Sequence, residues 1–346
     1  MKLLIAGLGA IGQRHLRNLR KLLGAQAEIL AYRVRGNPEV FTDTLKIEEG
    51  TSLETKYALQ VFHDFDQALN QNPDAVLICN PSSMHIPIAM KAARAGCHLF
   101  IEKPLSHNYE QIDDLITIAK KQNIKVVVGY QMRFHPCLLH LQSLLQKQAI
   151  GRILSVRAEV GEYLPGWHTY EDYRTTYGSR QDLGGGAILS QIHELDYLFW
   201  LFGLPRRIFA LGGHLSSLEI DVEDTVEILM EYSNNGHLIP VSLHQDYLQR
   251  PPSRTCQVIG DSGKILVDIR ALTVDVFDSK GNNVESTSYE GFQRNQLFVD
   301  ELKYFLDSLQ GLRTPLVTLE EGAQSLRMAL AAKESLASGK VVELER

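Results

Sequence analysis

Residues 2–12 read Lys-Leu-Leu-Ile-Ala-Gly-Leu-Gly-Ala-Ile-Gly, an apolar run that leads directly into three glycines spaced as GxGxxG. The run is typical of a buried parallel strand, and apolar residues then recur at helical spacing as far as Leu23. In such a turn the first glycine makes the bend, the second admits a pyrophosphate, and the third lets helix and strand pack. We therefore predict a dinucleotide cradle at Gly7, Gly9, Ala10, Ile11 and Gly12, with a turn that serves only packing as the alternative.

Strand-like and helix-like segments alternate along the first third of the chain. Apolar runs at 27–32, 75–79, 98–101 and 125–129 are strand candidates, and helical periodicity marks 10–23, 64–70, 86–95 and 109–122 between them. Such alternation predicts right-handed βαβ units in a doubly wound parallel sheet. Residues 1–128 are therefore expected to form an α/β Rossmann domain that binds NAD(P).

The pattern changes after about residue 130. Strand candidates separated by short turn signals follow one another at 153–160, 207–213, 225–232, 237–245, 256–260, 263–269 and 273–278, and helices are expected at 136–148, 187–202, 294–310 and 319–338. Runs of strands joined by turns favour a mostly antiparallel open sheet. Residues 129–346 are therefore expected to form an α+β domain for substrate binding and oligomerisation.

Composition excludes several classes of protein. The 346 residues carry 35 Lys+Arg against 41 Asp+Glu, a net charge of −6, which argues against a nucleic-acid partner. No apolar run approaches the ~18–20 residues of a membrane span. The spacing of the histidines and of the four cysteines fits neither a metal site nor a disulfide framework. We expect reduced thiols, no metal, no membrane association and a cytoplasmic location.

The end of the second predicted strand bears on the choice of cofactor. An acidic residue there would bind the ribose hydroxyls of NAD, but the sequence Tyr-Arg-Val-Arg-Gly-Asn at 32–37 has no carboxylate. Guanidinium groups pair well with a 2′-phosphate, so Arg33 and Arg35 slightly favour NADP over NAD. The alternative is that both arginines are solvated loop charges.

Four further stretches occur in a recognisable order. They are Asn80-Pro81 followed by His85, Glu102-Lys103-Pro104, the octapeptide Gly-Tyr-Gln-Met-Arg-Phe-His-Pro at 129–136, and Gly184-Gly185-Gly186 followed by His193-Glu194-Leu195-Asp196. With the glycine turn, this series resembles the glucose–fructose oxidoreductase/inositol dehydrogenase/MocA family over essentially the whole chain. The resemblance implies an NAD(P)-dependent dehydrogenase or reductase that acts on the CH–OH group of a sugar, nucleotide-sugar or cyclitol.

The resemblance also implies residue roles. Lys103 would exchange the proton of the reacting hydroxyl, and His193 would contact that hydroxyl or assist the transfer. The further cofactor contacts would be Asn80, Pro81, His85, Glu102 and Arg133. A homodimer or homotetramer is implied as well. Taken without the motif order, Lys103 would be a surface-turn residue and His193 a packing residue.

One departure from the family pattern leaves the activity open. Many members carry an aspartate three or four residues before the histidine, where this chain has Leu189 and Ser190. Ser190 and Gln191 can still hydrogen-bond a sugar hydroxyl and are candidate substrate contacts. The other interpretations are a tightly held cofactor that supports redox-assisted elimination or epimerisation, and a dinucleotide sensor without catalysis.

Residues 163–174 are dense in aromatic and polar groups. Aromatic faces stack on sugar C–H surfaces and polar groups recognise hydroxyls, so this segment predicts substrate contacts at Tyr163, Trp167, Tyr173 and Arg174. The alternative is an aromatic contact between domains or subunits.

Overall fold

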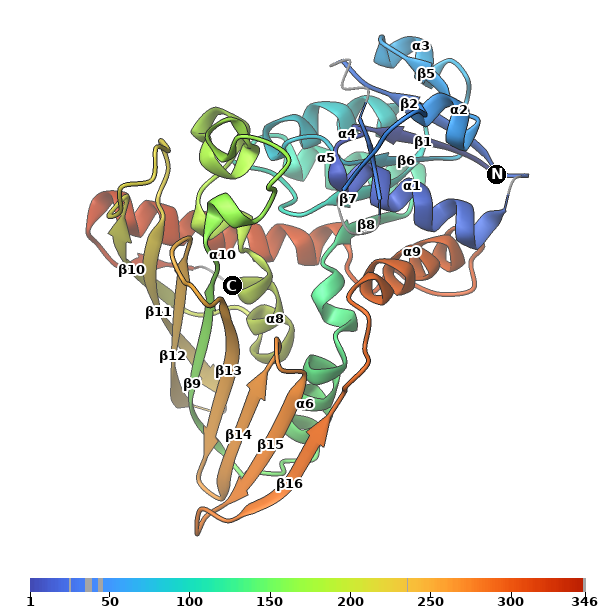
Figure 1. Cartoon of the computed structure of the whole chain (residues 1–346). Helices are drawn as coiled ribbons and strands as arrows, with labels where there is room; N and C mark the ends of the chain where they lie inside the picture. Colours follow the sequence, from blue (N-terminus) through green and yellow to red (C-terminus); the bar gives the residue numbers. More distant parts are fainter. Residues whose placement is uncertain (25, 35–38, 43–45, 235, 345–346) are drawn as a thin grey trace. The chain divides into compact units, whose positions relative to one another are not determined.

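The computed structural model describes residues 1–24, 26–34, 39–42, 46–234 and 236–344 (Figure 1). The chain divides into two compact units. The first contains Met1–Tyr130, Asp182–Gly184 and Phe298–Ala323, and the second contains Gln131–Gln181, Gly185–Leu297 and Gln324–Arg346. The sequence pattern predicts a boundary between residues 128 and 129. Two segments beyond that boundary, Asp182–Gly184 and Phe298–Ala323, cluster with the first unit.

The first unit is built on a six-stranded parallel sheet in the order β5-β2-β1-β6-β7-β8. Its strands are β1 (Lys2–Ala6), β2 (Glu28–Tyr32), β5 (Gln60–Phe62), β6 (Ala75–Ile78), β7 (His98–Glu102) and β8 (Val126–Gly129). The chain order reverses between β1 and β6, and ligands of doubly wound sheets bind outside the carboxyl ends of the strands at such a point. The predicted doubly wound α/β fold is therefore confirmed.

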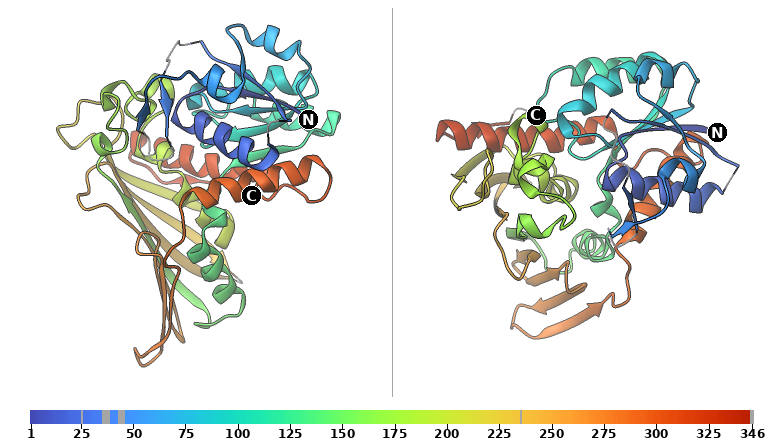
Figure 2. Two further views of the ribbon diagram at one scale, coloured as in Figure 1. Left: turned by 45° about the vertical axis from the view of Figure 1, so that its right-hand side comes forward. Right: turned by 45° about the horizontal axis from the view of Figure 1, so that its top comes forward.

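Helices cover both faces of this sheet (Figures 1 and 2). The bounds are α1 (Ala10–Leu23), α2 (Leu53–Tyr57), α3 (Phe65–Leu69), α4 (His85–Arg94), α5 (Ile112–Gln122) and α9 (Asn295–Leu309). Leu16 of α1 and Phe305 of α9 are fully buried in the core cluster that contains Leu3 and Ile5 of β1. Helix α4 packs against β6, β7 and α5. Two minor strands, β3 (Val40–Phe41) and β4 (Ile47–Glu48), pair with each other.

The second unit contains a nine-stranded sheet in the order β16-β15-β14-β13-β9-β12-β11-β10-β17. Its strands are β9 (Ile153–Gly161), β10 (Arg207–Gly213), β11 (Thr225–Asn234), β12 (His237–Asp246), β13 (Ser253–Gly260), β14 (Gly263–Asp268), β15 (Thr273–Asp278), β16 (Asn283–Ser288) and β17 (Val342–Glu343). Only the pairing of β9 with β12 is parallel. The predicted mostly antiparallel sheet is confirmed.

Helices pack on one face of the nine-stranded sheet. They are α6 (Pro136–Gln146), α7 (Ala187–Ser190), α8 (His193–Phe202) and α10 (Leu319–Ser338), of which residues from Gln324 onward belong to this unit. The single helix expected over 187–202 is interrupted at Gln191 and Ile192, where the Gln191 side chain donates to the backbone oxygen of Asp246 on β12. The other face exposes leucines, including Leu211, Leu229 and Leu238.

All four cysteines are buried and free. Among the described residues, no helix combines the length and the apolar character needed to cross a bilayer.

Candidate functional site

The glycine turn joins β1 to α1 at the point where the strand order reverses. Gly7 has a φ of +96°, and a β-carbon there would lie 2.9 Å from the backbone of Cys79 and Asn80, which follow β6. A β-carbon on Gly12 would lie 2.0 Å from the carbonyl oxygen of Gly7, whereas one on Gly9 would meet nothing within 4 Å. Gly7 therefore adopts a backbone conformation that favours glycine, Gly9 has no protein atom beside it, and Gly12 allows α1 to pack closely on the turn.

The start of α1 is suited to an anion. Gly9 is its N-cap and supplies no side-chain hydrogen bond, and the first turn, which includes Ala10 and Ile11, contains no acidic residue. The first N–H groups and the positive end of the helix dipole are therefore not neutralised by the helix's own side chains. Such an N-terminus binds a pyrophosphate readily.

The side chain of Arg33, at the end of β2, pairs with the carboxylate of Glu54 in α2. The pairing keeps the Arg33 side chain largely buried, at 16% exposure. The pKa of Glu54 lies below its usual value, because of a backbone hydrogen bond first and the charge of Arg33 second. The carboxylate of Glu54 therefore lies beside the end of β2, although residues 32–37 contain no acidic residue. Arg35 lies outside the described residues.

Asn80, Pro81 and His85 form the turn after β6. Asn80 Oδ1 is buried and has no hydrogen-bond partner among the described residues, as expected of an acceptor that awaits a ligand. His85 is 1% exposed, and its Nδ1 and Nε2 each lie 2.8 Å from a backbone carbonyl oxygen, of Pro104 and Asn80 respectively. His85 therefore holds two strand-end turns together, and both of its nitrogens already face the protein.

Lys103 follows β7 directly. In the sheet, β6 lies between β7 and β1, the strand that leads into the glycine turn. The Lys103 backbone N–H donates to Glu102 Oε2 at 3.1 Å, and the other oxygen of that carboxylate, Oε1, lies 2.6 Å from Nε2 of His15 in α1. Glu102 is 5% exposed and His15 is fully buried. The Glu102 carboxylate therefore contacts both the backbone of Lys103 and the His15 ring of α1. The sequence analysis did not single out His15, although a histidine between the apolar Ile11 and Leu19 at helical spacing is a visible signal.

Arg133 pairs with a buried carboxylate. Its guanidinium makes two hydrogen bonds to Asp196 of α8, at 3.0 Å and 2.8 Å, and Ser325 donates to the same carboxylate at 2.9 Å. Both charged side chains are 0% exposed in the second unit. The guanidinium is thus already paired with a protein carboxylate, and the expected contact of Arg133 with the cofactor stays a prediction.

His193 begins α8 and is 5% exposed. Ser190 and Gln191 lie just before it and are equally buried. Gln245 donates to the backbone oxygen of Gln191 at 2.7 Å, and the side-chain oxygens of both glutamines lack partners among the described residues. These two acceptors, one in the segment before His193 and one on β12, could accept hydrogen bonds from hydroxyl groups.

The triple glycine has a packing role. A β-carbon on Gly185 would lie 2.3 Å from the backbone oxygen of Tyr177, and one on Gly186, where φ is +105°, would lie 2.3 Å from Glu223. A β-carbon on Gly184 would meet His107 at 2.7 Å. Protein atoms, rather than open space, thus face each of the three glycines.

The aromatic segment packs on its own unit. Tyr163, Trp167 and Tyr173 lie against a small buried cluster that includes Leu164 and Tyr247. The cavity that Trp167 and Tyr173 line with the turns that follow has a volume of about 10 Å³, no more than one water requires. Within the second unit, this segment therefore forms a satellite core rather than a cavity large enough for a sugar.

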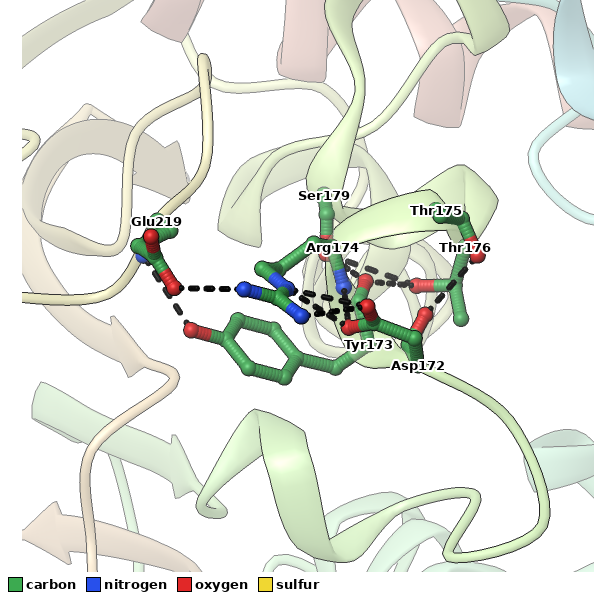
Figure 3. Close-up of polar contacts among 7 residues, drawn as sticks. All are labelled: Asp172, Tyr173, Arg174, Thr175, Thr176, Ser179 and Glu219. Carbon is green, nitrogen blue, oxygen red and sulfur yellow. Dashed lines mark hydrogen bonds and ion pairs between the residues drawn. The ribbon is translucent and has the colours of Figure 1, made fainter.

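The Arg174 guanidinium lies between the carboxylates of Asp172 and Glu219 (Figure 3). It lies 2.7 Å from Asp172 Oδ2 and 3.0 Å from Glu219 Oε2, and it lowers the pKa of Asp172. The hydroxyl of Tyr173 accepts the N–H of Glu219 at 3.2 Å. These contacts join the aromatic segment to the loop before β11, so an anionic substrate would compete with two carboxylates for Arg174.

Comparisons with known proteins agree with this architecture. Residues 1–130 match the family described as "Oxidoreductase family, NAD-binding Rossmann fold", and residues 138–266 match the GFO/IDH/MocA C-terminal domain. The chain is 28% identical to myo-inositol 2-dehydrogenase of Thermotoga maritima, covering 100% of this chain and 99% of that protein. It is 23% identical to 2,7-anhydro-N-acetylneuraminate hydratase of Mediterraneibacter gnavus, covering 77% of this chain and 66% of that protein.

A solved structure is similar over the whole chain. The WlbA dehydrogenase from Bordetella pertussis, in complex with NADH and UDP-GlcNAcA, superposes with a TM-score of 0.81 at 21% identity and covers 100% of this chain and 99% of its own. Both domain types thus occur here in the expected order. The chain belongs to the GFO/IDH/MocA family of oxidoreductases, whose N-terminal domain is an NAD-binding Rossmann fold.

Proposed function

We propose that this chain transfers hydride between a nicotinamide dinucleotide and a hydroxyl- or keto-bearing carbon of a sugar, nucleotide-sugar or cyclitol. The observation that carries the proposal is the arrangement of one sheet edge. The glycine turn follows β1, Asn80 follows β6, and Lys103 follows β7, and these strands are consecutive neighbours in the sheet. The glycine turn proposed to bind phosphate and the residue proposed to exchange the proton therefore follow strands that end at the same carboxyl edge.

The residues that would hold the dinucleotide are those of the turn and its neighbours. Gly9 leaves open space beside the N-terminus of α1, and the buried Asn80 Oδ1 offers an acceptor. Pro81, His85 and Glu102 would support this site, the last two through contacts with the protein backbone. A bound nicotinamide supplies the hydride acceptor or donor.

Lys103 is proposed as the proton acceptor in oxidation and the proton donor in reduction. A positioned side chain that removes the hydroxyl proton typically contributes about 10²–10⁴-fold to the rate. His193 is proposed to bind the reacting hydroxyl or assist the transfer, with Ser190 and Gln191 as further substrate contacts. Tyr163, Trp167, Tyr173 and Arg174 are proposed to shape the region around the substrate rather than to form a cavity of their own.

The decisive test compares Lys103→Met with the wild-type protein. NAD⁺ and NADP⁺ are offered with myo-inositol and with UDP-GlcNAcA, and absorbance at 340 nm reports turnover. We expect kcat to fall about 10²–10⁴-fold while the Kd for the reduced dinucleotide changes little. The control is Lys91→Met, since Lys91 is an exposed residue of α4 paired with Asp66. Full turnover in Lys103→Met would refute the proposed role.

A second candidate keeps the cofactor bound and uses a transient oxidation for elimination or epimerisation. The similarity to a hydratase favours it, as does the presence of buried Leu189 and Ser190 where an acid is common. Product formation without accumulation of reduced cofactor would establish this mode. Binding without any chemistry on both substrates would instead indicate a dinucleotide sensor.

We further propose that residues 1–128 bind the cofactor, that residues 129–346 bind substrate, and that the chain forms a homodimer or homotetramer. Exposed leucines on the uncovered face of the nine-stranded sheet support association, together with a depression of about 410 Å³ over β9–β12. Analytical ultracentrifugation of the wild type and of Leu229→Lys tests this. A monomeric wild type would contradict it.

A further inference from the structure

Lys103 is flanked on both sides by residues that buried histidines contact. The backbone oxygen of Pro104 lies 2.8 Å from Nδ1 of His85, the first residue of α4. The carboxylate of Glu102 lies 2.6 Å from Nε2 of His15, near the start of α1. Two helices on the sheet thus contact the residues on either side of the lysine.

Glu102 connects His15 to Lys103 through its two oxygens. Oε1 accepts from the His15 ring, and Oε2 accepts the backbone N–H of Lys103 at 3.1 Å. A carboxylate that accepts at both oxygens has a fixed plane, and the backbone that it bonds is fixed with it. Gly129 at the end of β8 lies beside this carboxylate, since a β-carbon there would lie in van der Waals contact with Glu102 Cδ, at 3.4 Å.

The position of His15 is itself closely determined. The ring is fully buried and meets Phe100 of β7 edge-on, with ring centroids 5.1 Å apart. A second edge contact joins it to Phe298 of α9 at 6.1 Å. The ring therefore has little freedom to turn away from Glu102, and it transmits the position of α1 to the end of β7.

We propose that His15 is a positioning residue, which orients the Lys103 backbone through the Glu102 carboxylate and so places the amine for proton transfer. The inference rests on the proposed role of Lys103 and extends it to a residue of the glycine-turn helix. Helix α1 then serves two purposes. Its N-terminus faces the pyrophosphate, and its second turn supports the proton-exchanging group.

The test is His15→Leu beside His15→Gln, assayed with NAD⁺ and myo-inositol. Misplacement of a reacting group by about 1 Å can cost on the order of 10²-fold, so we expect kcat of His15→Leu to fall about 10- to 100-fold. The KM for NAD⁺ should stay within about twofold, because the glycine turn is intact. His15→Gln, whose amide can still donate to Glu102, should recover most of kcat. Unchanged kcat in folded His15→Leu would overturn the inference.

A second readout needs no substrate. Trace acetylation by acetic anhydride, followed by mass spectrometry of the peptide, measures the reactivity of the half-buried Lys103 amine. We expect acetylation of Lys103 in His15→Leu to rise about threefold or more, with the other lysines unchanged. Equal reactivity in wild type and variant would count against the positioning role, even if the melting temperature falls.

Two further variants separate the possible causes. Glu102→Gln keeps an acceptor for His15 but replaces the second acceptor with an NH₂ group, so it should reproduce the kcat loss even if His15→Leu does not fold. Unaltered kcat in Glu102→Gln would also overturn the inference. His98→Leu is the matched control, because His98 lies at the other end of β7, where its ring accepts the Lys125 N–H. If Lys103→Met itself retains turnover, the proposed function fails rather than this inference alone.

Discussion

A β-carbon placed on Gly12 would lie 2.0 Å from the carbonyl oxygen of Gly7, a separation that no side chain can occupy without movement of the backbone. We therefore expect Gly12→Ala to displace α1 from β1, lower the melting temperature by several degrees and abolish measurable binding of NADH. Fluorescence titration with NADH and a thermal melt measure the two effects.

Gly9→Ala is the control for this prediction. Its β-carbon would meet no protein atom within 4 Å, and the backbone of Gly9, at φ −70°, suits any residue. The variant should keep the wild-type melting temperature and still bind NADH more weakly, because the methyl group enters the space reserved for the pyrophosphate. Wild-type NADH affinity in Gly9→Ala would show that the dinucleotide does not approach here.

The pairing of Arg33 with Glu54 predicts how the cofactor preference can be changed. Glu54→Gln removes the carboxylate that competes for the guanidinium, so the ratio of kcat/KM for NADPH to that for NADH should rise. Arg33→Ala should lower that ratio about tenfold, since a hydrogen bond to a charged group contributes about 1.5 kcal/mol. Steady-state kinetics with both cofactors measures the ratio. An unchanged ratio in both variants would remove Arg33 from cofactor recognition.

The buried Arg133–Asp196 pair predicts a large stability effect. Asp196→Asn removes the charge of the carboxylate that pairs with the fully buried Arg133 and weakens the acceptor for Ser325, so we expect a loss of about 3–5 kcal/mol in unfolding free energy. Trp167 and Trp200, the two tryptophans, both lie in the second unit, so urea titration followed by tryptophan fluorescence reports this unit. The double variant Arg133→Met/Asp196→Leu should recover much of the loss. Equal stability of single and double variants would contradict the buried-charge explanation.

Local sequence was sufficient for much of the fold. The glycine turn was recognised from residues 7–12 alone, because strand, glycines and helix are contiguous, and helix α10 begins and ends at the predicted residues 319 and 338. Periodicity showed that residues 294–310 form a helix but not which unit this helix joins. Phe305 packs in the first unit, in a core whose other residues, such as Leu3 and Leu16, are distant from it in the sequence.

The side-chain pairs at the sites could not be predicted in the same way. His15 and Glu102 are separated by 87 residues, and Arg133 and Asp196 by 63. Nothing in the local pattern distinguishes a buried arginine that is paired from one that awaits a ligand. The sequence therefore predicts neither Asp196 as the partner of Arg133 nor Glu54 beside the end of β2. The family resemblance supplied the motif order, whereas the partners of each motif residue required the three-dimensional fold.

The last prediction concerns His244 on β12. Its Nε2 lies 2.7 Å from Asp246 Oδ2 and its Nδ1 lies 2.7 Å from Glu227 Oε1. The hydrogen bond to Asp246, and then that to Glu227, raises the pKa of His244 to about 9. Because the pKa is higher in the folded state than the ~6.5 of an unfolded chain, protonated His244 stabilises the fold. This stabilisation is complete below pH ~6.5, declines as the pH rises and is lost above pH ~9.

We expect the unfolding free energy of the second unit to fall by about 1–2 kcal/mol more in the wild type than in His244→Gln between pH 6.5 and pH 9. This figure is smaller than the full pKa shift would give, because solvent screens a half-buried histidine whose partner Glu227 is exposed. Urea titration by tryptophan fluorescence at the two pH values measures it. His237→Gln, on the same strand, is the control and should keep the wild-type pH dependence. An identical pH dependence in wild type and His244→Gln would mean that the two carboxylates do not hold the proton on His244.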